Sequence, residues 1–297
     1  MYKVGFILNG KNRSKKRFYK ELNSARKNLR EIEFNVVETT EPGHATSLAS
    51  EFINEGYTHL IAIGGDGTVH ELINGVMKNF NEEVIVGVLP FGSANDFVKS
   101  AKPPNHLVDL FRAITDGKSI YIDIGKIEHQ GGVSYFNNIA DFGIGAEVVK
   151  RVNSSSKLFG AKLTFFKAIV ESFFSYVNKT IVCKTPEWTK EGKMNSIVVA
   201  NGKYFGNGMC IAPNAELNDG KFEVVVIGDI STRDYLKNMN GVQSGKELNH
   251  PKVQYLSANR LEISSTEKCG IEADGEFIGY APATVSLEVE KIRLLKG

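Results

Sequence analysis

Residues Leu60 to Glu71 read Leu-Ile-Ala-Ile-Gly-Gly-Asp-Gly-Thr-Val-His-Glu. Four apolar residues predict a buried strand, which runs into a glycine-rich loop, and residues 69–77 then have helical spacing. Glycines let backbone N–H groups approach an anion closely, and a helix N-terminus adds positive potential, so the loop suits nucleotide phosphates. Asp66 would place a carboxylate among these phosphates. That is unfavourable unless a divalent cation lies between them, so the loop implies Mg²⁺.

The alternation of strand and helix extends outward from this stretch. Strands are predicted at residues 4–8, 34–38, 60–63 and 84–89, with helices between them. This pattern predicts a doubly wound parallel sheet. Beyond about residue 110 few helices are predicted, and strands are predicted at 122–124, 135–139, 180–183, 196–200, 222–227, 261–264 and 285–289. The second part is therefore predicted to be mainly antiparallel β, with the boundary near residue 120.

The composition narrows the class of protein. The 297 residues carry a formal net charge of +2, which is too small to indicate nucleic-acid binding. The three cysteines form no C-x-x-C pair and no secretory signal precedes them, so we expect a cytoplasmic protein. The most apolar segment, residues 158–176, contains Lys162, Lys167 and Glu171, so any membrane contact should be peripheral.

Three further motifs could carry chemistry. Residues 90–97, Pro-Phe-Gly-Ser-Ala-Asn-Asp-Phe, follow a predicted strand, as the first loop does. Loops at adjacent strand ends can meet over one ligand, although Asn95 or Asp96 could simply cap a helix. Residues 270–276, Gly-Ile-Glu-Ala-Asp-Gly-Glu, predict a tight turn with two carboxylates, a common hairpin that could also supply a base. Asp219, in a polar turn before a strand, could hold a hard cation, although a plain β-turn is the simpler interpretation.

In this order, the four motifs resemble the diacylglycerol kinase catalytic-domain family, which includes soluble bacterial diacylglycerol kinases and sphingosine kinases. The resemblance covers nearly the whole chain. It implies an ATP-binding α/β domain at residues 1–120, completed by about residues 281–297, and a β-sandwich lipid-binding domain at 121–280, with the active site in the cleft between them. It further implies transfer of the γ-phosphate of ATP to a hydroxyl of a membrane lipid, diacylglycerol or a related alcohol, and weakly implies a homodimer.

The resemblance also assigns residues. Glu276 matches the proton acceptor, with Asp274 beside it and Asp66 in the phosphate loop. Asp219 and the carbonyls of Glu216 and Lys221 match a structural Mg²⁺ site, to which Asp123 is linked. The implied nucleotide site consists of Asn9, Gly10, Lys11, Thr40, Gly64, Gly65, Asp66, Gly67, Thr68, Ser93 and Asn95.

The chain departs from the family at a few positions. The family has Asn-Pro-x-Ser-Gly where this chain has Asn9-Gly-Lys-Asn-Arg, which puts the first ATP contact in question. Thr is usual at Ser93, and Arg at Lys99. None of these changes touches the acidic residues, so we expect activity.

Two other functions remain open. NAD kinases have a phosphate loop like residues 64–68, but they need a Thr-Pro-Thr-Gly-Ser-like segment that this chain lacks. A silent nucleotide-binding sensor is the non-enzyme alternative, and the retained Asp66, Asp274 and Glu276 argue against it.

Membrane contact has two candidate segments. Residues 158–176 have apolar residues at helical spacing with lysines beside them, a pattern that fits a core helix or an interfacial one. The basic stretch from Lys11 to Lys20 could contact phosphates or an anionic surface, or could simply be the solvated start of a helix.

Overall fold

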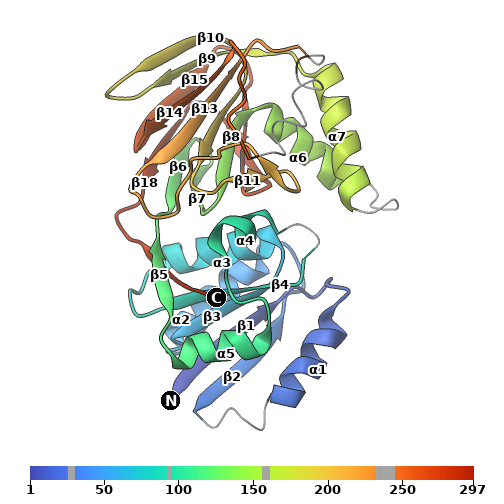
Figure 1. Ribbon diagram of the computed structural model, residues 1–297, viewed down its shortest axis with the longest axis vertical. Helices are drawn as coiled ribbons and strands as arrows, with labels where there is room; N and C mark the ends of the chain where they lie inside the picture. Colours follow the sequence, from blue (N-terminus) through green and yellow to red (C-terminus); the bar gives the residue numbers. More distant parts are fainter. Residues whose placement is uncertain (26–30, 93–94, 156–160, 232–233, 235–244) are drawn as a thin grey trace. The chain divides into compact units, whose positions relative to one another are not determined.

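The computed structural model describes residues 1–25, 31–92, 95–155, 161–231, 234 and 245–297, and within 161–166 it places only the side chain of Thr164. The chain divides into two compact units (Figure 1). Unit 1 contains residues 1–122 and 289–297, and unit 2 contains residues 123–288. The sequence predicted boundaries at about 120 and 281.

Unit 1 alternates strands and helices. Its elements are β1 (Tyr2–Leu8), α1 (Lys15–Ala25), β2 (Ile32–Glu38), α2 (His44–Asn54), β3 (His59–Gly64), α3 (Asp66–Lys78), β4 (Ile85–Pro90), α4 (Asp96–Ala101), α5 (Leu107–Thr115), β5 (Ser119–Ile122) and β19 (Ile292–Leu295). The strand order is β2-β1-β3-β4-β19-β5, and every pairing is parallel except that of β19 with β5. The predicted doubly wound sheet is confirmed.

Alternate residues of β1 show why helices cover both faces of this sheet. Val4, Phe6 and Leu8 belong to a core cluster with residues of α1 and α5. Gly5 points the opposite way, where a β-carbon would lie 2.6 Å from the Phe52 ring of α2. Successive side chains of a strand face opposite sides, so a strand that is apolar at nearly every position must be covered twice.

Unit 2 is mainly antiparallel sheet. Its elements are β6 (Gly125–His129), β7 (Gly132–Phe136), β8 (Ile139–Gly143), α6 (Ile144–Ser154), α7 (Ala161–Ser175), β9 (Lys179–Lys184), β10 (Thr189–Ala200), β11 (Tyr204–Phe205), β12 (Met209–Cys210), β13 (Phe222–Gly228), β14 (Val253–Ala258), β15 (Arg260–Ser265), β16 (Gly270–Ala273), β17 (Glu276–Tyr280) and β18 (Ala283–Leu287).

The large sheet of unit 2 has the order β17-β16-β8-β10-β9-β15-β18-β6-β7, and β13 pairs with both β10 and β14. Its apolar core is drawn from most of these strands, with the Phe136 and Phe222 rings stacked 5.5 Å apart at its centre. This architecture confirms the predicted antiparallel domain.

The structure differs from the sequence prediction at residues 135–139, which were expected to form one strand. Instead β7 ends at Phe136 and β8 begins at Ile139. Asn137 and Asn138 lie between the two strands, and their backbone N–H groups donate to the carboxylate of Asp274. A distant side chain thus takes over the backbone bonds that a continuous strand would have used for pairing.

Candidate functional site

The carboxyl ends of β1, β2, β3 and β4 carry the predicted nucleotide residues of unit 1. Because these neighbouring strands are parallel, their carboxyl ends meet along one edge of the sheet, where open α/β sheets bind ligands. Asn9, Gly10 and Lys11 follow β1, Thr40 follows β2, and the loop at 64–68 joins β3 to α3.

The two glycine-rich motifs meet at this edge, as the sequence suggested. Phe91 N and Gly92 N donate to the carbonyl of Gly64 at 3.1 and 2.9 Å. A β-carbon on Gly92 would lie 2.3 Å from the Cα of Gly65, so no larger residue fits without moving the loop. Ser93, predicted to complete the site, lies outside the described residues.

Asp66 joins the motifs through its side chain. Its Oδ2 accepts the N–H of Asp96 at 2.9 Å, and its Oδ1 accepts the N–H of Phe97 at 3.2 Å. These N–H groups belong to the unpaired first turn of α4, so Asp66 caps that helix. Asn95 precedes the helix, but its amide donates to the carbonyl of Gly92 instead. Each carboxylate oxygen has two acceptor sites, so Asp66 could still bind a cation.

The loop after β1 is tied to its neighbours. The Asn9 amide donates to the Thr68 hydroxyl at 3.4 Å, and Lys11 N donates to Asn9 Oδ1 at 3.0 Å. Gly10 N donates to the Thr39 hydroxyl at 3.3 Å, whereas the hydroxyl of the predicted Thr40 contacts His44 Nδ1 at 3.1 Å. The structure thus brings Asn9 and Gly10 to the phosphate loop and the end of β2.

Several supporting contacts around this loop were not predicted from the sequence. The Asn12 amide donates to the Phe91 carbonyl at 3.0 Å, which ties the motif at residues 90–97 to the loop after β1. Lys15 pairs with Glu38 at 2.9 Å, and this bond lowers the pKa of the Glu38 carboxyl. Asn12 and Lys15 lie in the basic stretch at residues 11–20, for which the sequence predicted no hydrogen-bond or ion-pair partner within the chain.

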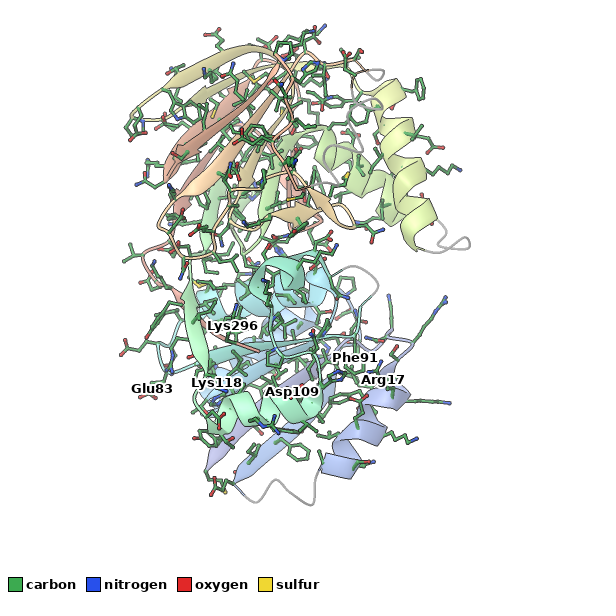
Figure 2. The ribbon with its side chains drawn as sticks, viewed as in Figure 1. Arg17, Glu83, Phe91, Asp109, Lys118 and Lys296 are labelled. Atoms are coloured by element: carbon green, nitrogen blue, oxygen red, sulfur yellow. The ribbon has the colours of Figure 1, made fainter. Side chains whose placement is uncertain are left out.

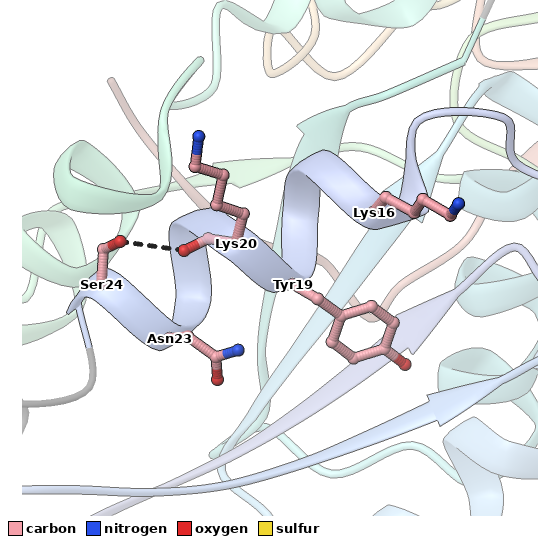
Figure 3. Close-up of a pocket in the computed structure, with 5 residues that line it drawn as sticks. All are labelled: Lys16, Tyr19, Lys20, Asn23 and Ser24. Carbon is pink, nitrogen blue, oxygen red and sulfur yellow. Dashed lines mark hydrogen bonds between the residues drawn. The ribbon is translucent and has the colours of Figure 1, made fainter.

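Helix α1 carries the basic stretch. The Arg17 guanidinium lies 5.3 Å from the centre of the Phe91 ring, so this helix contacts the motif at residues 90–97 (Figure 2). A surface hollow on the same helix is lined by Lys16, Tyr19, Lys20, Asn23 and Ser24 (Figure 3). Lys16 and Lys20 belong to the basic stretch considered for phosphate or membrane contact, whereas none of the five residues is among those assigned to the nucleotide site.

In unit 2 the acidic motif forms the hairpin between β16 and β17. Ala273 pairs with Glu276, which leaves Asp274 and Gly275 as a two-residue turn. Their φ angles are +51° and +87°. Positive φ at both positions defines a type I′ turn, for which Asp-Gly is a preferred sequence. The predicted tight turn is therefore present.

The two carboxylates of this hairpin have different surroundings. Asp274 is buried and accepts the N–H groups of Asn137, Asn138 and Ile139, each at 3.0 Å. Glu276 is exposed at the start of β17. The site therefore has one carboxylate that anchors the turn and a second that the turn presents to solvent.

Two more buried carboxyl groups, absent from the sequence predictions, lie behind the hairpin. Glu272 of β16 pairs in register with Asp141 of β8. Asp141 accepts the Ser196 hydroxyl and the N–H of Gly145, and burial raises its pKa to about 7. Burial also raises the pKa of Glu272 well above its ordinary value. The available signals were a lone aspartate in the apolar run 139–144 for Asp141, and a third acidic residue in the motif at 270–276 for Glu272.

The Asp219 turn lies beside Asp123. The buried Asp123 carboxylate accepts the N–H of Gly220 at 2.8 Å, and Asp123 N donates to the Leu217 carbonyl. Asp219 Oδ1 accepts the N–H of Lys221 at 3.3 Å. Within the described ranges, no group of three or more His, Cys, Asp and Glu side chains could hold a metal ion. The predicted donor set contains only oxygen atoms, the kind of ligand that Mg²⁺ takes, and binding of an ion here stays a prediction.

Comparisons with known proteins agree with this architecture. Residues 3–127 match the family model described as diacylglycerol kinase catalytic domain. Residues 138–296 match the model described as YegS C-terminal NAD kinase beta sandwich-like domain.

The relatives cover most of the chain. A diacylglycerol kinase of Staphylococcus aureus (strain bovine RF122 / ET3-1) is 30% identical over 301 residues, covering 95% of this chain and 89% of the relative. That of Staphylococcus carnosus (strain TM300) is 28% identical over 252 residues, covering 85% and 81%. A crystal structure of a diacylglycerol kinase from Bacillus anthracis strain Sterne has the same fold, with a TM-score of 0.73, 19% identity, and coverage of 99% and 97%.

These matches define a kinase, and the chain belongs to the diacylglycerol kinase family. In the part of the chain that the structure describes, no helix is long and apolar enough to cross a membrane.

Proposed function

We propose that this enzyme transfers the γ-phosphate of ATP to the hydroxyl of a membrane lipid, diacylglycerol or a related lipid alcohol. The observation that carries the proposal is the hairpin of unit 2, in which Asp274 anchors the turn and Glu276 is exposed beyond it. Phosphoryl transfer requires positioning and a group that accepts the hydroxyl proton, and an exposed carboxylate on a fixed turn can serve. Two relatives named diacylglycerol kinase support the lipid substrate.

Unit 1 would bind the nucleotide. The N–H groups at the start of α3 and the close approach of Gly65 and Gly92 suit the phosphates of ATP. Asp66 would hold Mg²⁺, which neutralises phosphate charge when bound. Asp219, with the carbonyls of Glu216 and Lys221, would hold a structural Mg²⁺ that stabilises the turn next to Asp123.

The acceptor lipid requires access to a bilayer. We propose that the protein contacts the membrane peripherally through α7 and the two residues after it, 176–177. Phe174 and Val177 are 75% and 64% exposed, an unusual exposure for apolar side chains. Lys167, seven residues before Phe174 and therefore on the same side of the helix, is also exposed. Of the lysines in and beside this segment, Lys157 and the side chain of Lys162 lie outside the described residues.

The test of the proposed function is Glu276→Gln. Glutamine preserves the shape and removes the basicity, so we expect lipid phosphorylation to fall by about 10²–10⁴ with ATP affinity unchanged. Single-turnover transfer from radiolabelled ATP to a panel of lipid alcohols, read by mass spectrometry, measures the first quantity, and ATP titration measures the second. Glu262→Gln, which changes an exposed glutamate of β15, is the matched control. A Glu276→Gln rate within about threefold of wild type would place the base elsewhere.

The NAD kinase alternative is supported by one observation, the family model that matches residues 138–296. Adding NAD to the same assay tests it directly. Phosphorylation of NAD, with all lipid alcohols unmodified, would replace the proposed function by this alternative.

A further inference from the structure

The hairpin that carries Glu276 is also held by a buried side chain of β16, the first strand of the hairpin. Glu272 is 3% exposed, and its Oε2 accepts the N–H of Gly275 at 2.9 Å. The contact reaches back across the turn from β16. The turn thus has two side-chain contacts. Glu272 binds Gly275, and Asp274 binds the N–H groups of residues 137–139.

The turn geometry leaves the Gly275 N–H without a partner in the strand ladder. In a two-residue hairpin the strand pairing closes at the flanking residues, here Ala273 and Glu276, so the turn's own N–H groups are outside the ladder. A register shift between Ile271 and Glu272 places Glu272 opposite Phe277. This irregularity re-aims the side chain, as β-bulges do beside active sites.

The groups packed around Glu272 are acidic. Asp141 faces it from β8, while Asp274 and Glu276 come from the hairpin itself. Burial and these carboxylates favour the neutral form of Glu272, because a second buried charge beside Asp141 would be costly. A neutral carboxyl group retains an oxygen that accepts the Gly275 N–H, so glutamine is a close mimic of this residue.

We propose that Glu272 is a positioning residue for the phosphoryl transfer: its carboxyl oxygen fixes the Asp274–Gly275 turn and thereby aims Glu276. The inference rests on the proposed function for its kinetic consequence, but the hydrogen bond can be tested without any reaction. Small displacements of a catalytic group are costly, since about 1 Å can reduce the rate about 10²-fold.

Two variants separate the hydrogen bond from the volume of the side chain. Glu272→Met preserves the length of the side chain but cannot accept the N–H, whereas Glu272→Gln can. We expect Glu272→Met to lower kcat about tenfold or more with KM for ATP unchanged, and Glu272→Gln to stay within about twofold of wild type. Ile263→Val, a core truncation in β15, is the control for a loss of stability alone. Wild-type kcat in Glu272→Met, or an equal loss in Glu272→Gln, would overturn the proposal.

Hydrogen exchange at Gly275 provides a readout that is independent of the substrate. The amide should exchange slowly in wild type and Glu272→Gln, and at least about tenfold faster in Glu272→Met, because free energies of local opening set exchange rates. Equal protection in all three proteins would refute the role of Glu272. If wild type phosphorylates none of the lipids, the proposed function fails, and the exchange result still decides whether Glu272 holds the turn.

Discussion

At the scale of single residues, Asp66 illustrates how one side chain serves two purposes. Its position in the glycine-rich loop predicted contacts with phosphates and a cation. In the structure it also caps α4 through the N–H groups of Asp96 and Phe97. The carboxylate thus connects both glycine-rich loops, and its removal should affect structure as well as chemistry.

Asp66→Ala should lower phosphoryl transfer by about 10² or more, because it removes charge stabilisation at the phosphates. It should also reduce the free energy of unfolding by about 0.5–2 kcal/mol, the usual cost of losing a helix cap. Asp66→Asn retains one acceptor, so it should recover part of the stability but not the transfer. Urea denaturation and the lipid kinase assay measure the two effects.

The exposed Asp109, in the first turn of α5, is the control position for this prediction. Asp109→Ala should change neither quantity by much. A fully active Asp66→Ala enzyme would remove Asp66 from the catalytic machinery, and unchanged stability would show that the cap contributes little.

The distinction between Asp274 and Glu276 shows the limit of sequence reasoning at this scale. The motif predicted a turn with two carboxylates but could not separate an anchor from a base. The separation depends on residues 137–139, more than a hundred positions away, which bind one carboxylate and not the other. Only the tertiary pairing of β8 with β16 brings them together.

At the scale of elements, β1, β3 and β4 were predictable because their apolar runs are uninterrupted. The short β16 and β17 were not predicted as strands, since each has only four or five residues and contains glycine or acidic residues. β19 was also not predicted as a strand. Ile292–Leu295 is a brief run at the end of the chain, yet it occupies an interior position between β4 and β5.

Leu294→Ala should destabilise unit 1 markedly. Leu294 is fully buried in β19, and such truncations typically cost about 2–5 kcal/mol. Val289→Ala, at a side chain that is 87% exposed just before this strand, is the matched control. Chemical denaturation, with ATP binding as the probe of folded unit 1, should show a loss of stability only in Leu294→Ala. Equal stability of the two variants would mean that β19 is dispensable for the sheet.

At the scale of the whole molecule, the buried acids of unit 2 connect its stability to pH. Burial raises the pKa of Asp141 to about 7, from an ordinary value of 3.8, and burial with Asp141 raises that of Glu272. Cys269 and Tyr176 also interact with Asp141, but burial raises their pKa values, so they stay neutral. An acid with a raised pKa binds more protons in the folded state than in the unfolded state near neutral pH. Its favourable contribution is therefore complete below about pH 4, the unfolded pKa, and is lost progressively as the pH rises to the folded pKa of about 7.

We therefore expect the free energy of unfolding to fall as the pH rises from about 4 to about 7 and to level off above that, and Asp141→Asn to reduce that fall. In the variant the amide oxygen can accept the Gly145 N–H and the amide nitrogen can donate to Ser196, so both contacts of Asp141 have a replacement. Each pKa unit corresponds to about 1.4 kcal/mol, so the stability of the variant relative to wild type should increase by up to about 1.4 kcal/mol per pH unit from about pH 4 to pH 7, and stay constant above about pH 7. Urea denaturation across this range provides the measurement. Parallel curves for the two proteins would show that Asp141 has the same affinity for its proton folded and unfolded, and that the slope, if present, arises at Glu272.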